Sequence, residues 1–374
     1  MKSKTIWLWI LLILLLIISG CSSKDAKSNN QEDDITAVSQ TVISNFLVKA
    51  DGNVLLRRAG WNGFFPINFG TTLKPGDLLV VEKGGAASIF CGDSNTWNED
   101  SFDLDADGEQ HGIPCQSGHP PRPWPDVTAL RGEENPNIPY VIYPKNSALL
   151  SNTPALKWHV LEGIDEYTLS IISDDGADRQ EISVQGEKSS WPQEWPPMES
   201  NATYALIVEG GGKRSDEGND IHSGVGFWLL DENTADLISS QVNMLHGTTD
   251  SESVKNFLVA QIYINNQLRA EAVQSLEEIS NEVEGSSVWV MLGRTLLEID
   301  CFEEAASSFQ SALEIANTAG ELEIQALAEY GIGLAFQFEK EEELAKSHFE
   351  KAREIFEEIG DKEHIKEIEV ILQE

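Results

Sequence analysis

The chain has 374 residues, and its 62 acidic residues outnumber its 26 basic ones, giving a formal net charge of −36 at pH 7. Such a negative field repels phosphate backbones, which argues against nucleic-acid binding. A hydrophobic fraction of 41% and 10 Trp residues exclude a disordered acidic chain and allow two or three domains with buried cores.

Residues 1–21 have the layout of an export signal. Two lysines precede an unbroken apolar run of 13 residues, Ile6 to Ile18. A membrane-spanning helix needs about 17–25 residues, so this run fits the apolar core of a secretory signal better. An N-terminal anchor that is never cleaved is one alternative.

The end of this segment, Ile17–Cys21 (Ile-Ile-Ser-Gly-Cys), resembles the bacterial lipobox. The resemblance implies cleavage before Cys21, lipidation of its thiol, and attachment to a membrane of the bacterial cell envelope on the extracytoplasmic side. An ordinary signal peptide is the other interpretation. Residues 22–40 are mostly polar and are expected to form a flexible tether.

Residues 41–138 are expected to form an all-β domain. Short apolar segments separated by glycines, the pattern of short strands and tight turns, occur at residues 42–47, 53–56, 78–81 and 86–90. Leu73–Asp77 predicts a turn, because Pro75 presets φ and Gly76 permits a positive φ.

Three stretches of this domain, Asp51–Arg58, Gly70–Asp77 and Gly85–Ile89, resemble a FecR-type β-domain. They carry a G-x-V strand, a G-x-x-L-x-x-G-D turn and an alternating strand. The resemblance covers residues 48–93 and implies a fold rather than a function, since such domains occur both in sensing proteins and as general envelope modules.

Cysteine usage agrees with an oxidising envelope, which permits disulfides. Cys91 and Cys115 are candidates for a disulfide that closes one loop, and two buried thiols are the alternative. Zinc is disfavoured, because no CxxC pair or His–Cys spacing accompanies them. Cys301 lies in a helical region and is expected to be a small, buried apolar residue.

Asp103, Asp105 and Asp107, followed by Gly108, have the spacing of a calcium loop. Carboxylates two residues apart can converge on one hard cation, so Ca²⁺ is a candidate ligand. A full EF-hand needs Glu at the twelfth position, where this chain has Pro114, and an acidic solvated loop is the alternative. The proline-rich stretch that follows, residues 112–125, is expected to be irregular.

Residues 139–232 are expected to form a second β-domain, because apolar residues alternate with period two. The motifs P-x-L-x-W, Y-x-L-x-I and Y-x-L-x-V resemble a fibronectin type III or immunoglobulin-like sandwich. The resemblance implies that Trp158 is the core indole and that the Tyr204 hydroxyl bonds to backbone. Trp191, Trp195 and Trp228 also admit a sugar-stacking interpretation, but core packing is favoured.

Residues 236–374 change to a helical period and repeat themselves. The same steps recur in two units, Gly293, Ala305, Phe309, Ala312 and Gly333, Ala345, Phe349, Ala352, and an earlier unit has its reference position at Ala260. The reference positions are 33 and then 40 residues apart, so residues 317–325 extend either the connection or the helices. Residues 361–374 are expected to form a capping helix.

This pattern resembles tetratricopeptide repeats, in which small residues let antiparallel helices approach and large ones fill the seam. The family's Pro at the end of the second helix is absent. The resemblance implies a concave groove for a protein or peptide ligand, lined by Phe257, Gln261, Val290, Arg294, Tyr330 and Gln337. Residues 251–374 hold 27 acidic and 9 basic residues, which favours a neutral or basic ligand. A spacer with a solvated acidic face is the alternative.

No catalytic motif stands out, since none of the 7 His residues falls in HExxH and no GxSxG occurs. The sequence therefore predicts a multidomain, non-enzymatic protein with two all-β domains, FecR-like and then fibronectin III/Ig-like, followed by an all-α tetratricopeptide solenoid. We expect a lipid-anchored envelope scaffold that binds partner proteins. A calcium- or glycan-binding adhesion module and a FecR-like envelope sensor are the alternatives.

Overall fold

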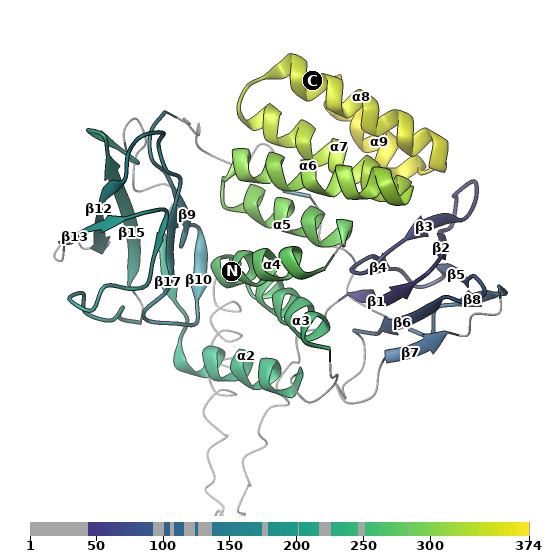
Figure 1. The fold of residues 1–374 in the computed structure, drawn as a ribbon, viewed down its shortest axis with the longest axis horizontal. Helices are drawn as coiled ribbons and strands as arrows, with labels where there is room; N and C mark the ends of the chain where they lie inside the picture. Colours follow the sequence, from purple (N-terminus) through teal and green to yellow (C-terminus); the bar gives the residue numbers. More distant parts are fainter. Residues whose placement is uncertain are drawn as a thin grey trace, which may run out of the picture. The chain divides into compact units, whose positions relative to one another are not determined.

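The structure is a computed structural model of the chain. It describes residues 44–92, 101–104, 108–115, 124–125, 137–173, 179–200, 202–216, 226–245, 251–283 and 285–373. These residues belong to one compact unit, Gln40–Glu374. Within the described ranges, an N-terminal part built of strands precedes a C-terminal part of eight helices (Figure 1). The expected order of β-domains before a helical array is therefore confirmed at this level.

Strands β1 to β8 form the first β-region, which consists of two four-stranded sheets. One sheet has the order β4-β1-β6-β7, with strands Thr72–Leu73, Asn45–Asp51, Ala86–Phe90 and Ser101–Leu104. The other has the order β3-β2-β5-β8, with strands Phe65–Ile67, Val54–Arg57, Leu78–Val81 and Gln110–Gly112. All neighbouring strands are antiparallel, and alternate residues such as Leu56 and Leu79 are fully buried between them.

Four of these strands, β1, β2, β5 and β6, overlap the apolar segments that the sequence predicts. The predicted turn at Leu73–Asp77 also forms, with Gly76 at φ +93° and the Asp77 N–H donating to the Lys74 carbonyl at 3.0 Å. The expected calcium loop differs at its start, because Asp103 belongs to strand β7, Ser101–Leu104. Its pairing with β6 is a tertiary contact, which local acidic composition does not reveal.

Strands β9 to β17 form the second β-region. One sheet has the order β10-β17-β15-β12-β13, with β16 beside β15, and the other has the order β14-β11-β9. The strands are Val141–Tyr143 (β9), Ser147–Leu149 (β10), Leu156–Trp158 (β11), Glu166–Ser173 (β12), Arg179–Gln185 (β13), Lys188–Ser189 (β14), Thr203–Gly210 (β15), Lys213–Arg214 (β16) and Phe227–Leu229 (β17). Pairing is antiparallel except between β10 and β17.

Aromatic side chains fill the second β-region. Trp158 is 1% exposed, as expected for a core indole, and the Tyr204 hydroxyl accepts a hydrogen bond from the Glu199 backbone N–H at 2.8 Å. Trp191 and Trp195 are 9% and 4% exposed and pack edge to face with ring centroids 5.3 Å apart. Neither indole therefore presents a flat face to a sugar, which agrees with the favoured core interpretation.

The eight helices form the helical stack. They are Glu232–Leu245 (α2), Glu252–Asn265 (α3), Arg269–Glu282 (α4), Ser286–Glu298 (α5), Phe302–Ala319 (α6), Leu322–Phe338 (α7), Glu342–Ile359 (α8) and Lys362–Ile371 (α9). Successive helices pack side by side, from α2 at one end to α8 and α9 at the other (Figure 1).

Small residues allow this close packing. A Cβ added at Gly293 would lie 2.8 Å from the ring of Phe309, and one at Gly333 would lie 2.7 Å from the ring of Phe349. Both small–large pairs come from the repeated sequence pattern. The longer second spacing is explained by longer helices, since α6 has 18 residues where α4 has 14.

None of the helices in the described part of the chain is long and apolar enough to cross a membrane. The apolar run Ile6 to Ile18, the lipidation candidate Cys21 and the predicted tether, residues 22–40, lie outside the described residues.

Candidate functional site

A cavity of about 940 Å³ lies between the first β-region and the helical stack. The β-region contributes residues 44–46, Arg58 and the segment Gly70–Pro75. The described helical residues that line it come from α3, α5, α7 and α9, and none comes from the intervening helices α4, α6 and α8. One face of the alternating helices thus forms a wall, and Trp124 and Pro125 complete the lining.

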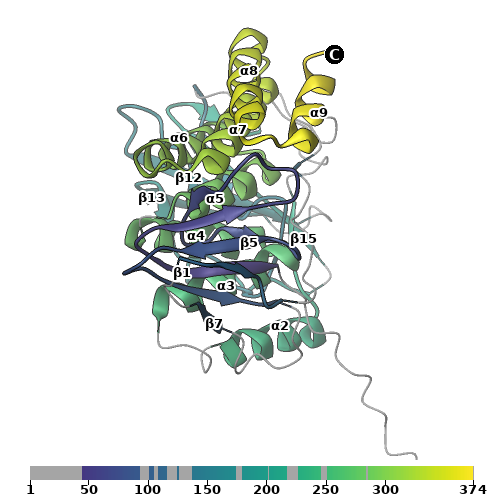
Figure 2. The ribbon, with the colours of Figure 1, turned by 90° about the vertical axis from the view of Figure 1, so that its right-hand side faces the viewer.

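Four of the six residues predicted to line a groove do line this cavity. They are Gln261 on α3, Val290 and Arg294 on α5, and Tyr330 on α7. The structure therefore brings together side chains separated by up to 69 positions in the sequence. The strands of the first β-region lie beside the helices that carry these residues (Figure 2).

The other two predicted residues lie elsewhere. Phe257 is fully buried, with its ring 5.0 Å from Phe46 and 5.1 Å from Phe69 in edge-to-face contacts. The first β-region covers it, a contact that patterns within each domain do not reveal. Gln337, near the end of α7, is not among the lining residues, and its buried Oε1 has no hydrogen-bond partner in the described ranges.

The contact around Phe257 requires a close approach of the two walls. A Cβ added at Gly70, which has φ +85°, would lie 3.3 Å from Ser287 and 3.4 Å from Phe257. The nearby Thr71 hydroxyl lies 3.4 Å from the Ser287 hydroxyl. A glycine at this turn therefore lets the β-region pack directly on α3 and α5.

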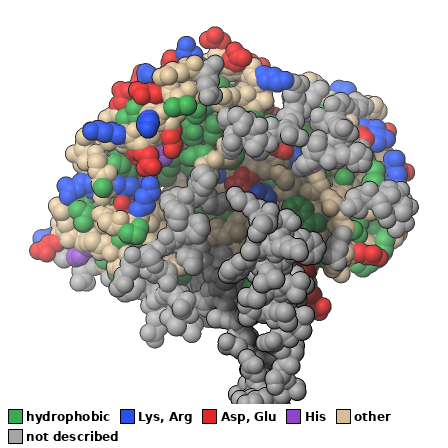
Figure 3. Space-filling model, turned by 180° about the vertical axis from the view of Figure 1, so that it is seen from behind, with side chains coloured by type: hydrophobic (Ala, Val, Ile, Leu, Met, Phe, Trp, Pro, Cys, Tyr) green, Lys and Arg blue, Asp and Glu red, His purple; other side chains and the backbone are tan. Residues whose placement is uncertain are grey.

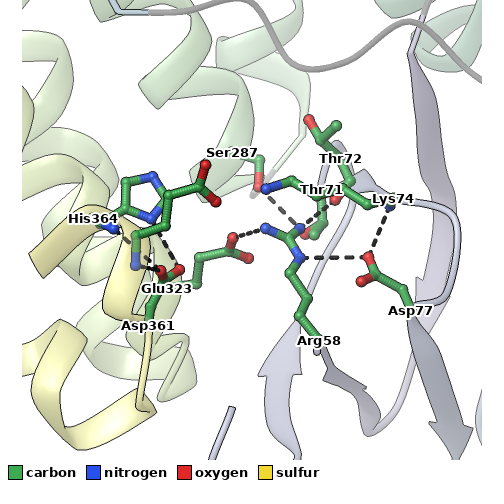
Figure 4. A network of polar contacts seen from close by, with 10 residues as sticks. Arg58, Thr71, Thr72, Lys74, Asp77, Ser287, Glu323, Asp361 and His364 are labelled. Atoms are coloured by element: carbon green, nitrogen blue, oxygen red, sulfur yellow. Dashed lines mark hydrogen bonds and ion pairs between the residues drawn. The ribbon is translucent and has the colours of Figure 1, made fainter. Parts of the chain in front are cut away.

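Arg58 is the centre of a buried polar network that joins the two walls (Figure 4). Its guanidinium donates to the Glu323 carboxylate on α7 and, at 2.5 Å, to the Thr72 carbonyl, and it pairs with Asp77 at 3.4 Å. The side chains of Arg58, Glu323 and Asp77 are 10%, 6% and 3% exposed. Removing one partner from such a network leaves a buried charge uncompensated.

Burial dominates the electrostatics of both carboxylates in this network. It raises the pKa of Glu323 and of Asp77, and the Arg58 charge acts against the rise in each case. Asp77 also accepts a hydrogen bond from the Lys74 backbone N–H at 2.8 Å. The network therefore joins the two walls by hydrogen bonds and ion pairs, although the buried Nε of Arg58 has no hydrogen-bond partner in the described part of the chain.

A second polar group closes the α9 end of the cavity (Figure 4). Asp361 begins α9 and accepts hydrogen bonds from the His364 N–H at 3.3 Å and from the Glu363 N–H at 3.2 Å, while its Oδ2 lies 2.9 Å from His364 Nδ1. Burial alone would raise the pKa of Asp361, but the interactions with His364 lower it to about 2. The imidazole stacks on Phe356 at 4.5 Å and lines the cavity.

Part of the cavity lining is aromatic. Trp124 lies 5.0 Å from the Tyr330 ring, 5.9 Å from the Phe309 ring and 4.5 Å from the Arg294 guanidinium carbon. Burial, followed by the charge of Glu367, raises the pKa of Tyr330 to about 12, against a smaller lowering by Arg294. The phenol is therefore neutral at ordinary pH and can act as a hydrogen-bonding and stacking surface.

The cavity combines several kinds of surface. Its lining includes aromatic and aliphatic side chains, charged groups of both signs, and the carboxylates of Glu363 and Glu367 on α9. In the described part of the chain, no group of three or more His, Cys, Asp or Glu side chains could hold a metal ion. On the face shown in Figure 3, acidic and basic side chains are interspersed with hydrophobic ones, so the acidic excess is not gathered in one patch there.

Cys91, Cys115 and Asp103, three other residues that the sequence singled out, are not among the residues that line the cavity. Cys91 and Cys115 form a disulfide with an S–S distance of 2.00 Å and a Cα–Cα distance of 5.3 Å. Asp103 belongs to strand β7, opposite Ser88, whereas the other two calcium candidates, Asp105 and Asp107, lie outside the described residues.

Sequence reasoning missed Arg58, Glu323, His364 and Trp124. A glutamate in the first turn of an acidic helix usually indicates a solvated face, so Glu323 gave no signal. Trp124 did give a signal in the sequence. A large aromatic side chain between two prolines, in an otherwise polar and irregular segment, needs a surface to cover it.

Comparisons with known proteins add little. No protein family matches the chain, and no curated protein does. Among solved structures, the chain is similar to a β-1,2-glucanase from Parabacteroides distasonis, with 11% identity and a TM-score of 0.21. The match covers 85% of this chain and spans 59% of the glucanase chain. A likeness this distant carries no argument about activity.

Proposed function

We propose that this protein is a lipid-anchored scaffold of the bacterial cell envelope, which binds an extended segment of a partner protein in the cavity between its first β-region and its helical stack. The observation that carries the proposal is the composition of the wall. Alternate helices, α3, α5, α7 and α9, each present side chains to one continuous cavity. A surface repeated along a stack suits an extended ligand that contacts several helices in turn.

We also propose the finer fold assignments on which this function rests. The contacts of Gly293 with Phe309 and of Gly333 with Phe349 support tetratricopeptide repeats in the helical stack. The turn at Leu73–Asp77, which links β4 of one sheet to β5 of the other, supports a FecR-like first β-region. The buried Trp158 and the hydroxyl contact of Tyr204 support a fibronectin III or Ig-like second β-region.

The anchor and the ligand chemistry follow from the sequence. The lipobox-like Ile17–Cys21 supports lipidation at Cys21 and placement outside the cytoplasm. The strongly acidic helical stack supports a neutral or basic ligand and not a nucleic acid. A binding function with no catalytic step is the proposal that best fits a cavity lined by aromatic, aliphatic and charged side chains from several helices.

Envelope sensing is the second candidate, and one observation favours it. Arg58 of the first β-region contacts Glu323 of α7 beside the cavity. A ligand in the cavity would touch both walls, so its binding would alter the contact between the two regions. The scaffold function needs no such change.

The test is photocrosslinking in intact cells, with a crosslinking amino acid at Leu327, which lines the cavity, or at Gln310, an exposed residue of α6, as the control. We expect one envelope protein to be crosslinked from Leu327 but not from Gln310. The same product should be lost in a variant with Arg294→Glu and Tyr330→Ala. Equal products from both positions, or products that the variant retains, would contradict the proposal.

A further inference from the structure

Trp124 is in contact with side chains of the helical stack. Its indole contacts the rings of Phe309 and Tyr330, at 5.9 and 5.0 Å, and lies under the Arg294 guanidinium at 4.5 Å. These three residues belong to three consecutive helices, α5, α6 and α7. An edge-to-face ring and a guanidinium above the indole form a built aromatic site.

Glycines give this site its depth. A Cβ at Gly293 on α5 would lie 2.8 Å from the Phe309 ring, and one at Gly331 on α7 would lie 2.5 Å from it. Because neither residue has a Cβ atom, the Phe309 ring of α6 can lie between α5 and α7 and contact Trp124. The repeated small residues therefore shape a binding surface as well as the helix packing.

Trp124 occupies this site without belonging to either β-region as a strand residue. Trp124 and Pro125 are both half-buried and both line the cavity. In the sequence they stand in the proline-rich run His119–Asp126, His-Pro-Pro-Arg-Pro-Trp-Pro-Asp. Proline-rich peptides favour an extended conformation and dock on aromatic surfaces at a low entropic cost.

We propose that the ligand of the cavity is an extended, proline-rich peptide with a Trp-Pro pair, and that the chain's own Trp124–Pro125 occupies this subsite as an intramolecular competitor. This inference rests on the proposed function and names its ligand class. The carboxylates of Glu363 and Glu367 also line the cavity, so a basic residue in the partner peptide, such as Arg122 in the chain's own run, is favoured.

The competition should lower the affinity of the protein for a free peptide by a measurable factor. A segment tethered to its own binding site acts at an effective concentration on the order of 1 mM. A free peptide with an intrinsic Kd of about 0.1 mM would then bind the unmodified protein about tenfold more weakly than a protein whose own tryptophan is removed.

The test uses the full-length protein in detergent and a fluorescent synthetic peptide with the sequence of residues 119–126. We expect Trp124→Ala to bind the peptide about tenfold more tightly than the unmodified protein, as expected for removal of an intramolecular competitor. A matched control, Trp228→Ala in the second β-region, should bind like the unmodified protein. Adding Arg294→Glu to Trp124→Ala, or replacing the peptide's Trp with Ala, should abolish binding.

Equal affinities of the unmodified protein and Trp124→Ala would overturn the intramolecular competition. Failure of a natively folded Trp124→Ala protein, checked by its thermal transition, to bind the peptide would overturn the ligand class. A partner crosslinked at Leu327 that does not compete with the peptide would also overturn the ligand class, while leaving the proposed function standing.

Discussion

The two β-regions contact the same helical stack in different ways. The second β-region meets the helix ends through satisfied hydrogen bonds, since Lys145 donates to the Asp300 carbonyl at 2.9 Å and Asn146 to the Glu298 carbonyl at 3.0 Å. The Ser147 hydroxyl accepts from the Ala270 N–H at 3.0 Å. The first β-region meets one helix end, where the Asn62 N–H donates to the Ile359 carbonyl of α8 at 2.7 Å, but it also meets the helix faces, and there its contact encloses a cavity of about 940 Å³.

This difference separates a structural contact from a candidate binding site. Helix ends have unsatisfied backbone groups, and the second β-region supplies partners for them. The first β-region is joined to the stack at the Phe46–Phe69–Phe257 cluster, at the Arg58 network and at Asn62, which donates to the last carbonyls of α8. It also leaves space for the cavity. We call the contact of the first β-region with the helical stack the first contact, and that of the second β-region the second contact. We therefore expect substitutions at the first contact and at the second contact to differ in their effect on ligand binding as well as on stability.

The largest expected effect follows from Arg58→Ala, which leaves Glu323 and Asp77 buried without their shared cation. The free energy of unfolding should fall by about 3–5 kcal/mol, measured by urea denaturation. The matched control is Arg57→Ala. Arg57 lies over the Phe64 ring at 4.7 Å, and its removal should cost about 0.5–1 kcal/mol. A loss below 1 kcal/mol for Arg58→Ala would show that the network does not hold the first contact together.

The pH dependence of stability tests the second contact through Glu271 of α4. Its Oε1 accepts from the Leu150 N–H at 2.8 Å, while its Oε2 is buried without a partner in the described part of the chain. Burial raises the pKa of Glu271 from 4.5 to about 7, against a lowering by the Leu150 hydrogen bond. The residue as a whole is half-buried, but the burial of the carboxyl oxygen decides the shift.

The sign of the effect is fixed by proton uptake. Between pH 4.5 and 7 the folded protein retains a proton that the unfolded chain releases, so stability should fall as the pH rises through this window. Glu271→Gln should remove this slope and be more stable than the unmodified protein at pH 8 by about 2–3 kcal/mol. Thermal unfolding between pH 4 and 8, with the exposed Glu278→Gln as control, measures it. An unchanged slope would refute the assignment.

Lys145→Met should weaken the second contact by about 2 kcal/mol, because a charged donor to the Asp300 carbonyl is lost. Lys145 is 9% exposed, and the nearby Asp300 carboxyl has its pKa raised by burial and lowered by this lysine. Lys188→Met, at an exposed position of the same region, is the control. Peptide binding should be unchanged in Lys145→Met, and a loss of binding would mean that the two contacts are not functionally separate.

Asp361→Asn should have the smallest effect. The pKa of Asp361 is lowered to about 2, so its contribution to stability is present above its ordinary value of 3.8 and lost as the pH falls toward 2. Asn caps a helix as well as Asp does, so the cost at pH 7 should be about 1 kcal/mol, from the weakened His364 contact. Asp51→Asn, in an exposed ion pair, should change little. A cost that persists at pH 2 would argue against the carboxylate–imidazole contact.

The parts of the fold that sequence analysis predicts are those with a local period. Strands β2 and β5 alternate buried and half-buried residues, and the repeated Gly–Phe steps predict which helices touch. The same repeat identified Arg294 and Tyr330, which line the cavity.

What the sequence does not predict is how one region covers another. Phe257 has the helical spacing of a groove residue, but the first β-region buries it, and Arg58 finds its partner Glu323 265 positions away. Trp124 lies in a stretch without any period, so neither its helical neighbours nor its place in the cavity can be read from local pattern. These contacts are tertiary, and they are the ones that define the site.

Amide hydrogen exchange tests most directly whether the cavity is the binding site. The sample is full-length Trp124→Ala, with and without a saturating concentration of the peptide of residues 119–126. We expect peptide-dependent protection in α5, in α7 and in residues 70–75, and no change in β10 or α4, which form the second contact. Protection of β10 and α4, or unchanged exchange in α5 and α7, would contradict a binding site between the first β-region and the helical stack.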